Sequence, residues 1–108
     1  MILPTVYEYT YFTQQTVRLP AALKLAVNST LSNMRLGIYN TPKMVKGGGQ
    51  GLVKTKVKMN PAIAAATNVW ETRIDGHWRI FYYTNPGGNL TVLSIGHLDD
   101  NSRLMEPA

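Results

Sequence analysis

Hydrophobic and polar residues alternate most regularly between Val69 and Asp100, where the spacing predicts three consecutive antiparallel strands. The first two, Val69–Ile74 and His77–Thr84, flank a turn that contains Asp75-Gly76. A two-residue turn would mix polar and apolar side chains on both faces of this hairpin. A three-residue turn over 75–77 separates them, and we expect it because a one-residue slip would move the apolar set to solvent. One face then carries Trp70, Thr72, Ile74, Trp78, Ile80 and Tyr82, and the other carries Glu71, Arg73, Arg79, Phe81 and Tyr83.

This register places Arg73 and Arg79 directly opposite each other, and like charges across a strand pair destabilise a sheet. Two interpretations are open. Glu71 shares their face, so the three side chains could form a salt-bridged trio on the surface. Alternatively, an anion binds at the two guanidinium groups, with His77 and His97 as possible neighbours.

The third strand, Leu90–Gly96, is apolar on both sides, which is typical of a central strand covered on both faces. The length of the loop before it sets the position of His97. A five-residue loop over 85–89 brings His97 close to His77 beside the arginines, whereas a four-residue loop turns His97 to the other side. The sequence pattern leaves both arrangements open.

The N-terminal third predicts a strand and two helices. Aromatic residues alternate with others in Thr5–Tyr11, which favours a strand. Phe12–Leu19 predicts a short helix, and Pro20 can begin a second one because its missing N–H costs nothing in a first turn. Gly37 fits the end of that second helix. Its apolar stripe recurs at spacings of four, four and three residues: Leu23, Val27, Leu31 and Met34.

Residues 38–51 predict a loop, because the glycine-rich part that starts at Lys46 is unsuited to a regular element. This part also lacks the Gly-Lys-Ser/Thr ending of a phosphate-binding loop. A strand predicted over Leu52–Met59 places three lysines on one side, about 6.6 Å apart. Such a row could follow a phosphodiester backbone, or it could protect a sheet edge from aggregation. These lysines are Lys54, Lys56 and Lys58.

The remaining segments carry weaker signals. Asn60-Pro61 ends the lysine-bearing strand, and residues 62–67 predict at most one helical turn. Residues 98–108 predict a frayed tail, of which about 99–108 is expected to be flexible.

Composition narrows the function classes. A chain of 108 residues predicts a single domain, residues 1–108, with one modest core. It has 11 Lys and Arg against 6 Asp and Glu, hence a net charge of +5 and a pI near 9.7. Such a basic domain attracts polyanions, and we expect nucleic acid or an acidic protein rather than a membrane.

The absence of cysteine removes disulfides, thiolate nucleophiles and zinc–cysteine sites, and the two histidines lack the spacing of metal ligands. No apolar run has the length of a membrane span, and the first residues do not resemble a signal peptide. We therefore expect a cytoplasmic protein without metal, cofactor or membrane partner.

The order of these elements, together with two motifs, resembles the RelE/ParE superfamily of toxins from bacterial and archaeal toxin–antitoxin modules. The segment from Phe12 to Pro20 is similar to the helix pair of that family. The motifs are short, but the resemblance covers most of the chain. They are Trp70, Arg73, Gly76 and Trp78-Arg79-Ile80 with Tyr82 and Tyr83, and Ile95-Gly96-His97 at the end of the last strand.

The resemblance implies an α+β fold, with two N-terminal helices packed on a twisted antiparallel sheet of about four to five strands. It also implies one of two toxic activities, each silenced by a cognate antitoxin protein. RelE-like members cleave mRNA in the ribosomal A site without a metal, by attack of a ribose 2′-OH on the adjacent phosphate. ParE-like members inhibit DNA gyrase and are not nucleases.

Carried over position by position, the resemblance implies three catalytic residues. Arg79 would bind the scissile phosphate, and Arg73 would stabilise the charge that develops on it. His97 would transfer a proton, a role that suits an imidazole near neutral pH. The candidate phosphate-binding residues are Lys46, Lys54, Lys56 and Lys58.

Two positions depart from the family pattern. Leu98 follows His97 where many active members have another Arg or His, and Leu104 stands where several place an aromatic residue. We expect a ribosome-dependent mRNA endonuclease. The alternatives are a ParE-like gyrase-inhibiting or catalytically degenerate toxin-fold protein, and a non-enzymatic basic module that binds nucleic acid.

Overall fold

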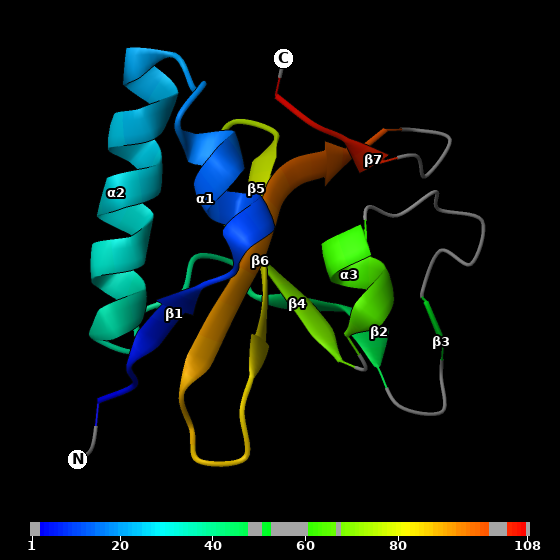
Figure 1. Ribbon diagram of the computed structural model, residues 1–108. Helices are drawn as coiled ribbons and strands as arrows, with labels where there is room; N and C mark the ends of the chain where they lie inside the picture. The colour runs from blue at the N-terminus through cyan, green and yellow to red at the C-terminus, as the bar shows by residue number, and fades with distance from the viewer. Residues whose placement is uncertain (1–2, 48–50, 53–60, 67, 100–103, 108) are drawn as a thin grey trace.

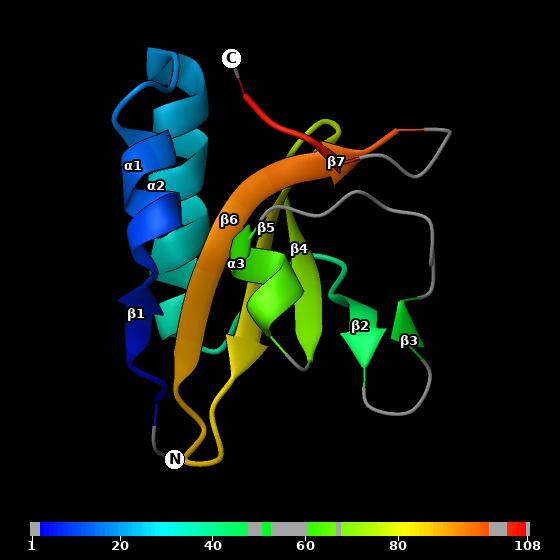
Figure 2. The same cartoon turned by 45° about the vertical axis from the view of Figure 1, so that its right-hand side comes forward.

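The computed structural model describes residues 3–47, 51–52, 61–66, 68–99 and 104–107. The strands form one curved sheet, with α1 and α2 on one side and α3 on the other (Figure 1), and Figure 2 separates the two layers of helices more clearly. The elements are β1 (Val6–Glu8), α1 (Thr10–Thr16), α2 (Ala21–Arg35), β2 (Lys43–Gly47), β3 (Gly51–Leu52), α3 (Pro61–Ala65), β4 (Val69–Asp75), β5 (Trp78–Thr84), β6 (Leu90–Leu98) and β7 (Leu104–Met105).

Within the described residues, the strand order is β1-β6-β5-β4-β2-β3, and β7 pairs with β6 as well. The expected α+β class with two N-terminal helices is confirmed. The sheet is mixed rather than purely antiparallel, because β1 runs parallel to β6, with Val6 opposite Leu90 and Glu8 opposite Val92. The other pairings are antiparallel.

The predicted register of the β4–β5 hairpin is confirmed in the interior of the sheet. Trp70 pairs with Tyr82, and Arg73 pairs with Arg79. The turn differs from the expected three residues, because β4 continues to Asp75 and only two residues separate the strands. A register shift between Arg73 and Asp75 absorbs the difference, so the hairpin keeps its apolar face together with a two-residue turn. Gly76 in this turn has a φ of 53°, which glycine adopts at little cost.

The helices begin and end near their predicted limits. β1 ends at Glu8, so the alternation after it does not continue as a strand, and α1 begins at Thr10. α2 follows Pro20 and buries the four residues of the predicted stripe. Gly37 has a φ of 75°, and its N–H donates to the Met34 carbonyl at 3.0 Å, which closes the helix as expected.

The sheet carries a hydrophobic core on each face, which explains why β6 is apolar on both sides. The larger core lies under α1 and α2, and the partly buried Trp70, Ile74 and Trp78 pack against it. The smaller core lies under α3 and contains Val45, Ala62, Ile63, Val69, Phe81 and Leu93. The larger core contains Phe12, Leu19, Leu23, Val27, Leu31, Met34, Ile80, Tyr82, Leu90, Val92 and Ile95.

Two segments have more regular structure than the sequence predicts. Residues 38–51 are not simply a loop, because β2 pairs with β4, with Lys43 opposite Glu71. Residues 98–108 are not simply a frayed tail, because β7 pairs with the end of β6, with His97 opposite Met105. The predicted helical turn over 62–67 corresponds to α3, and the predicted strand Leu52–Met59 lies outside the described residues after Leu52.

The free edge of β6 is covered by a side chain where β1 ends. The Gln15 amide nitrogen donates to the Ile95 carbonyl at 3.1 Å, and the Ile95 N–H donates to the Gln15 amide oxygen at 2.8 Å. One glutamine of α1 therefore satisfies the same backbone groups that a neighbouring strand would. None of the described helices combines the length and hydropathy needed to cross a membrane.

Candidate functional site

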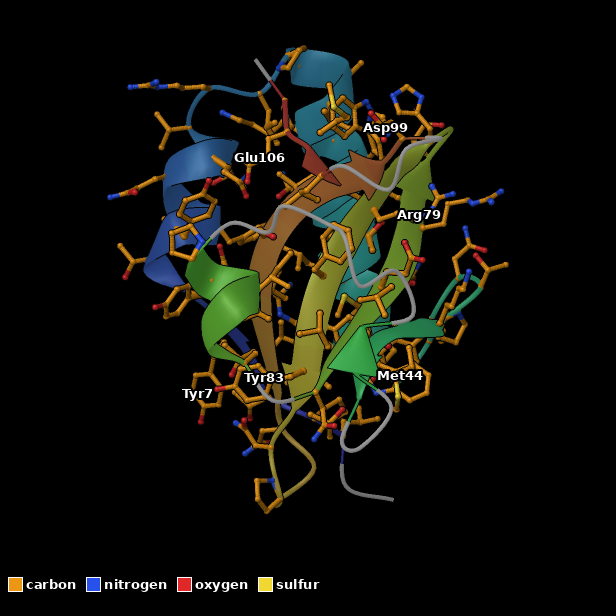
Figure 3. All side chains as sticks on the ribbon, turned by 90° about the vertical axis from the view of Figure 1, so that its right-hand side faces the viewer. Tyr7, Met44, Arg79, Tyr83, Asp99 and Glu106 are labelled. Atoms are coloured by element: carbon orange, nitrogen blue, oxygen red, sulfur yellow. The ribbon has the colours of Figure 1, made fainter. Side chains whose placement is uncertain are left out.

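The face of the sheet that carries α3 is divided into an apolar part and a charged part. The apolar part is the smaller core. The charged part lies toward the turn between β4 and β5, and Arg79 is seen there at the end of the sheet away from α3 (Figure 3). Side chains alternate along a strand, so the registers Lys43–Glu71 and Arg73–Arg79 place four charged residues on this one face. We call Lys43, Glu71, Arg73 and Arg79 the charged cluster.

Arg79 is the most constrained member of the charged cluster. Its Nε lies 3.5 Å from Glu71 Oε2, and the two side chains are 21% and 13% exposed. Its Nη1 donates to the carbonyl oxygens of Gly76 at 3.1 Å and Trp78 at 3.0 Å. These contacts engage three of the five N–H donors of a guanidinium, and no described residue is hydrogen-bonded to the two on Nη2.

Arg73 lies opposite Arg79 and is exposed. The salt-bridged trio, one of the two interpretations that the sequence leaves open, is present in part, because Glu71 forms an ion pair with Arg79. One carboxylate faces three cations in the charged cluster, so the cluster keeps a net charge of +2, from three positive charges minus one negative. This excess attracts an anion, and the binding of one stays a prediction.

His97 lies in an aromatic group at the end of the sheet. Its ring is 4.3 Å from that of His77 and 5.0 Å from that of Trp78, both in edge-on geometry. The loop before β6 has five residues, since Thr84 pairs with Leu90, and His97 lies close to His77 as that loop length predicts. The expectation that this loop length also brings His97 beside the arginines is wrong.

A register shift decides the side of the sheet on which His97 projects. The shift falls between Phe81 and Tyr82, so that Gly96, and not His97, pairs on the face of Arg79. His97 therefore projects toward Trp78, on the side of α1 and α2. Of the three predicted catalytic residues, the structure brings Arg73 and Arg79 together and places His97 on the other side.

The predicted lysine row is not part of the described structure. Lys54, Lys56 and Lys58 lie outside the described residues, and Lys46 is placed only through its backbone, which pairs with Val69 and Leu52. Lys43 joins the site instead. The sequence pattern does not single it out, because residues 38–51 predict a loop and Lys43-Met44-Val45 is too short an alternation to predict a strand.

The C-terminal segment is fastened to α1 by a tyrosine. The Tyr11 hydroxyl donates to the Glu106 carboxylate, at 2.9 Å from Oε1 and 2.8 Å from Oε2. Burial, this hydrogen bond and the negative charge of Glu106 raise the pKa of Tyr11 to about 12, so the hydroxyl keeps its proton at neutral pH. Leu104, where the family pattern favours an aromatic residue, packs against the smaller core.

No metal-binding group emerges from the described residues, since nowhere in them do three or more His, Cys, Asp or Glu side chains gather. The charged cluster and the two histidines together offer three cations, one carboxylate and two imidazoles. Such groups bind phosphate esters and transfer protons.

The chain is similar in fold to a known protein structure. No family model matches the chain, and no curated protein matches it in sequence. Among solved structures, the chain is similar to one chain of the RelBE2 toxin–antitoxin complex from Mycobacterium tuberculosis. The TM-score is 0.52 and the identity 16%, and the match covers 89% of this chain and 99% of that chain. The chain therefore has the fold of that chain, in agreement with the RelE-like fold that the sequence resemblance implies.

Proposed function

We propose that this protein is the toxin of a toxin–antitoxin pair and that it cleaves mRNA on the ribosome without a metal. The observation that carries the proposal is the pair Arg73 and Arg79, placed opposite each other on the sheet of a RelE-like fold. Like charges are not placed across a strand pair for stability, so their position is explained best by an anion that binds there.

The reaction needs positive charge around one phosphate and two proton transfers. The ribose 2′-oxygen forms a bond to phosphorus and the bond from phosphorus to the 5′-oxygen breaks, which leaves a cyclic phosphate and a 5′-hydroxyl. Arg79 would bind a non-bridging oxygen through Nη2, and Arg73 would stabilise the developing charge. One proton leaves the 2′-hydroxyl and another reaches the 5′-oxygen.

The two histidines supply groups for these proton transfers from the rim of the sheet. Arg79 Nη1 is hydrogen-bonded to the carbonyl of Gly76, next to His77, and His77 contacts His97 at a centroid distance of 4.3 Å. A substrate bound at Arg79 therefore lies next to the turn that carries His77. His97 would transfer its proton from the other side of the sheet, beyond the turn, and not from the face of the charged cluster.

The proposed partners are the ribosome with its mRNA and a cognate antitoxin protein, in the cytoplasm of the cell. The net charge of +5 favours association with RNA. The structurally similar chain comes from a complex of a toxin with its antitoxin, which supports an antitoxin as a partner here.

A second candidate function is that of a ParE-like gyrase inhibitor or of a catalytically degenerate toxin-fold protein. The position of His97, away from the face of Arg79, favours it, as does the ion pair that already engages Arg79 with Glu71. Such a toxin needs no acid–base group. A basic module that only binds nucleic acid is the third alternative.

Inducible expression in bacterial cells, with mapping of new 5′ ends on ribosome-bound mRNA, tests these alternatives. The comparison is between wild type, Arg79→Ala and Arg18→Ala, which removes an exposed arginine from the α1–α2 connection. Growth arrest with A-site cuts that vanish only in Arg79→Ala supports the nuclease. Arrest without cuts favours gyrase or another protein target, and growth without arrest eliminates the toxin function.

A further inference from the structure

Lys43 occupies a position in the charged cluster that neither the sequence motifs nor the fold likeness assigns. Its Cα pairs with that of Glu71, so Lys43 and Arg79 lie on the two strands that flank the strand of Glu71. The side chain of Lys43 is exposed, whereas that of Arg79 is mostly enclosed. Of the three cations in the charged cluster, Lys43 is therefore the one nearest the β2–β3 edge of the sheet.

The backbone that precedes Lys43 is held in place by hydrogen bonds to β4. The Thr72 hydroxyl is fully buried and bonds both the N–H of Asn40 at 3.0 Å and its carbonyl at 2.9 Å. The N–H of Arg73 donates to the same carbonyl at 2.9 Å. Thr41 then has a φ of 45°, which β-branched residues rarely adopt, immediately before Pro42 and Lys43. The segment that leads into β2 is therefore fixed against β4 beside Arg73.

The spacing suits two neighbouring phosphates rather than one. Lys43 lies two strands from Arg79 and two residues along the sheet, which corresponds to about 12 Å between their Cα atoms. Both side chains are long, and a lysine is a flexible point charge that does not require one fixed geometry. A single phosphate at Arg79 leaves Lys43 free to reach the next group of the same strand.

We infer that Lys43 binds the RNA phosphodiester next to the one held by Arg79, and so positions the substrate strand across β4. This inference rests on the proposed function and adds to it a residue that binds substrate without taking part in the chemistry. Its ligand is a phosphodiester of a single-stranded RNA, as in an mRNA. The phosphates of a helical ribosomal RNA offer the same chemistry, and a double-stranded RNA of equal length distinguishes the two ligands in the test.

The test is binding of a labelled single-stranded RNA oligonucleotide of about twelve nucleotides, measured by fluorescence anisotropy from about 50 to 200 mM salt. The variants are Lys43→Ala, Lys43→Arg and a matched control, Lys24→Ala, which removes an exposed lysine from α2 on the other side of the sheet. We expect Lys43→Ala to weaken binding about two- to fivefold. It should also reduce the slope of log affinity against log salt by about 0.7, the value for one lost phosphate contact.

Lys43→Arg should keep the slope of wild type, and Lys24→Ala should change the affinity less than Lys43→Ala does. A thermal unfolding curve equal to that of wild type establishes that Lys43→Ala is folded. The inference is overturned if Lys43→Ala and Lys24→Ala have the same effect, or if wild type shows no salt-dependent binding. It is also overturned if Lys43→Ala weakens only the binding of a double-stranded RNA of equal length, which would assign Lys43 to helical RNA.

These outcomes are independent of the test of the proposed function. If Arg79→Ala abolishes A-site cuts in cells while Lys43→Ala leaves RNA binding unchanged, the nuclease stands and the role of Lys43 is wrong. If no cuts appear but Lys43→Ala reduces the salt slope as expected, the RNA site exists without the nuclease.

Discussion

Replacing Glu71 by glutamine should strengthen binding of RNA and weaken the fold. An incoming phosphate meets an Arg79 whose Nε lies 3.5 Å from Glu71, so that among the contacts with described residues Nη2 alone is left without a partner. A bidentate contact through Nε and Nη2 requires that the ion pair be broken first. A largely enclosed pair at this separation contributes about 1 kcal/mol. Since a factor of ten corresponds to about 1.4 kcal/mol, Glu71→Gln should tighten binding about fivefold.

The assay is anisotropy with the same single-stranded RNA, together with urea unfolding. The control is Glu8→Gln, an exposed glutamate on β1 whose loss raises the net charge from +5 to +6 just as Glu71→Gln does. Unfolding should show a loss of up to about 1 kcal/mol for Glu71→Gln alone. If the two variants tighten binding equally, overall charge explains the change and the argument from the Arg79 donors is wrong.

Three further predictions concern the frame around the site. Gln15→Ala should lower the free energy of unfolding in urea by about 2 kcal/mol, because it removes two part-buried hydrogen bonds to β6, whereas the exposed Gln14→Ala should change little. Gly96→Ala should cost about 1–3 kcal/mol in the same assay, because its Cβ would lie 2.8 Å from a backbone oxygen of β7. The native pKa of Tyr11 is about 12, above its ordinary value of 10, so its contribution to stability is fully present below pH 10 and is lost as the pH rises to about 12. Between these pH values the unfolding free energy of Tyr11→Phe should therefore fall less than that of wild type.

The parts of the fold that the sequence predicts well are those with a long periodic pattern. For α2, the sequence predicts both the buried face and the end of the helix at Gly37. The buried residues are Leu23, Val27, Leu31 and Met34. The β4–β5 hairpin shows its register because five apolar side chains must share one face with Thr72, and a slip would expose them together. In both elements, local pattern and tertiary packing favour the same arrangement.

The parts that the sequence does not predict depend on contacts between distant segments. β2 begins at Lys43 because Asn40 is bonded to Thr72 and Arg73, more than thirty residues later in the chain. β7 lies on β6 where Gly96 allows close approach of its backbone. Neither strand is long enough to show an alternation of its own, so nothing local in residues 38–51 or 98–108 distinguishes them from loops.

The relation between Arg79 and His97 depends on a single irregularity of β5 and β6. Continued without a shift, the pairing of Tyr82 with Val92 would bring His97 opposite His77, on the arginine face. The shift after Phe81 instead pairs Arg79 with Gly96, so the Gly-His motif presents its glycine, and not its imidazole, to the charged cluster. The proposed phosphate site at the arginines and the two histidines are thereby separated into two parts of the sheet end, joined at the turn between β4 and β5. A bulge in a strand changes the face on which the following side chains project while the core stays in place, so one irregularity decides whether His97 shares a face with Arg79.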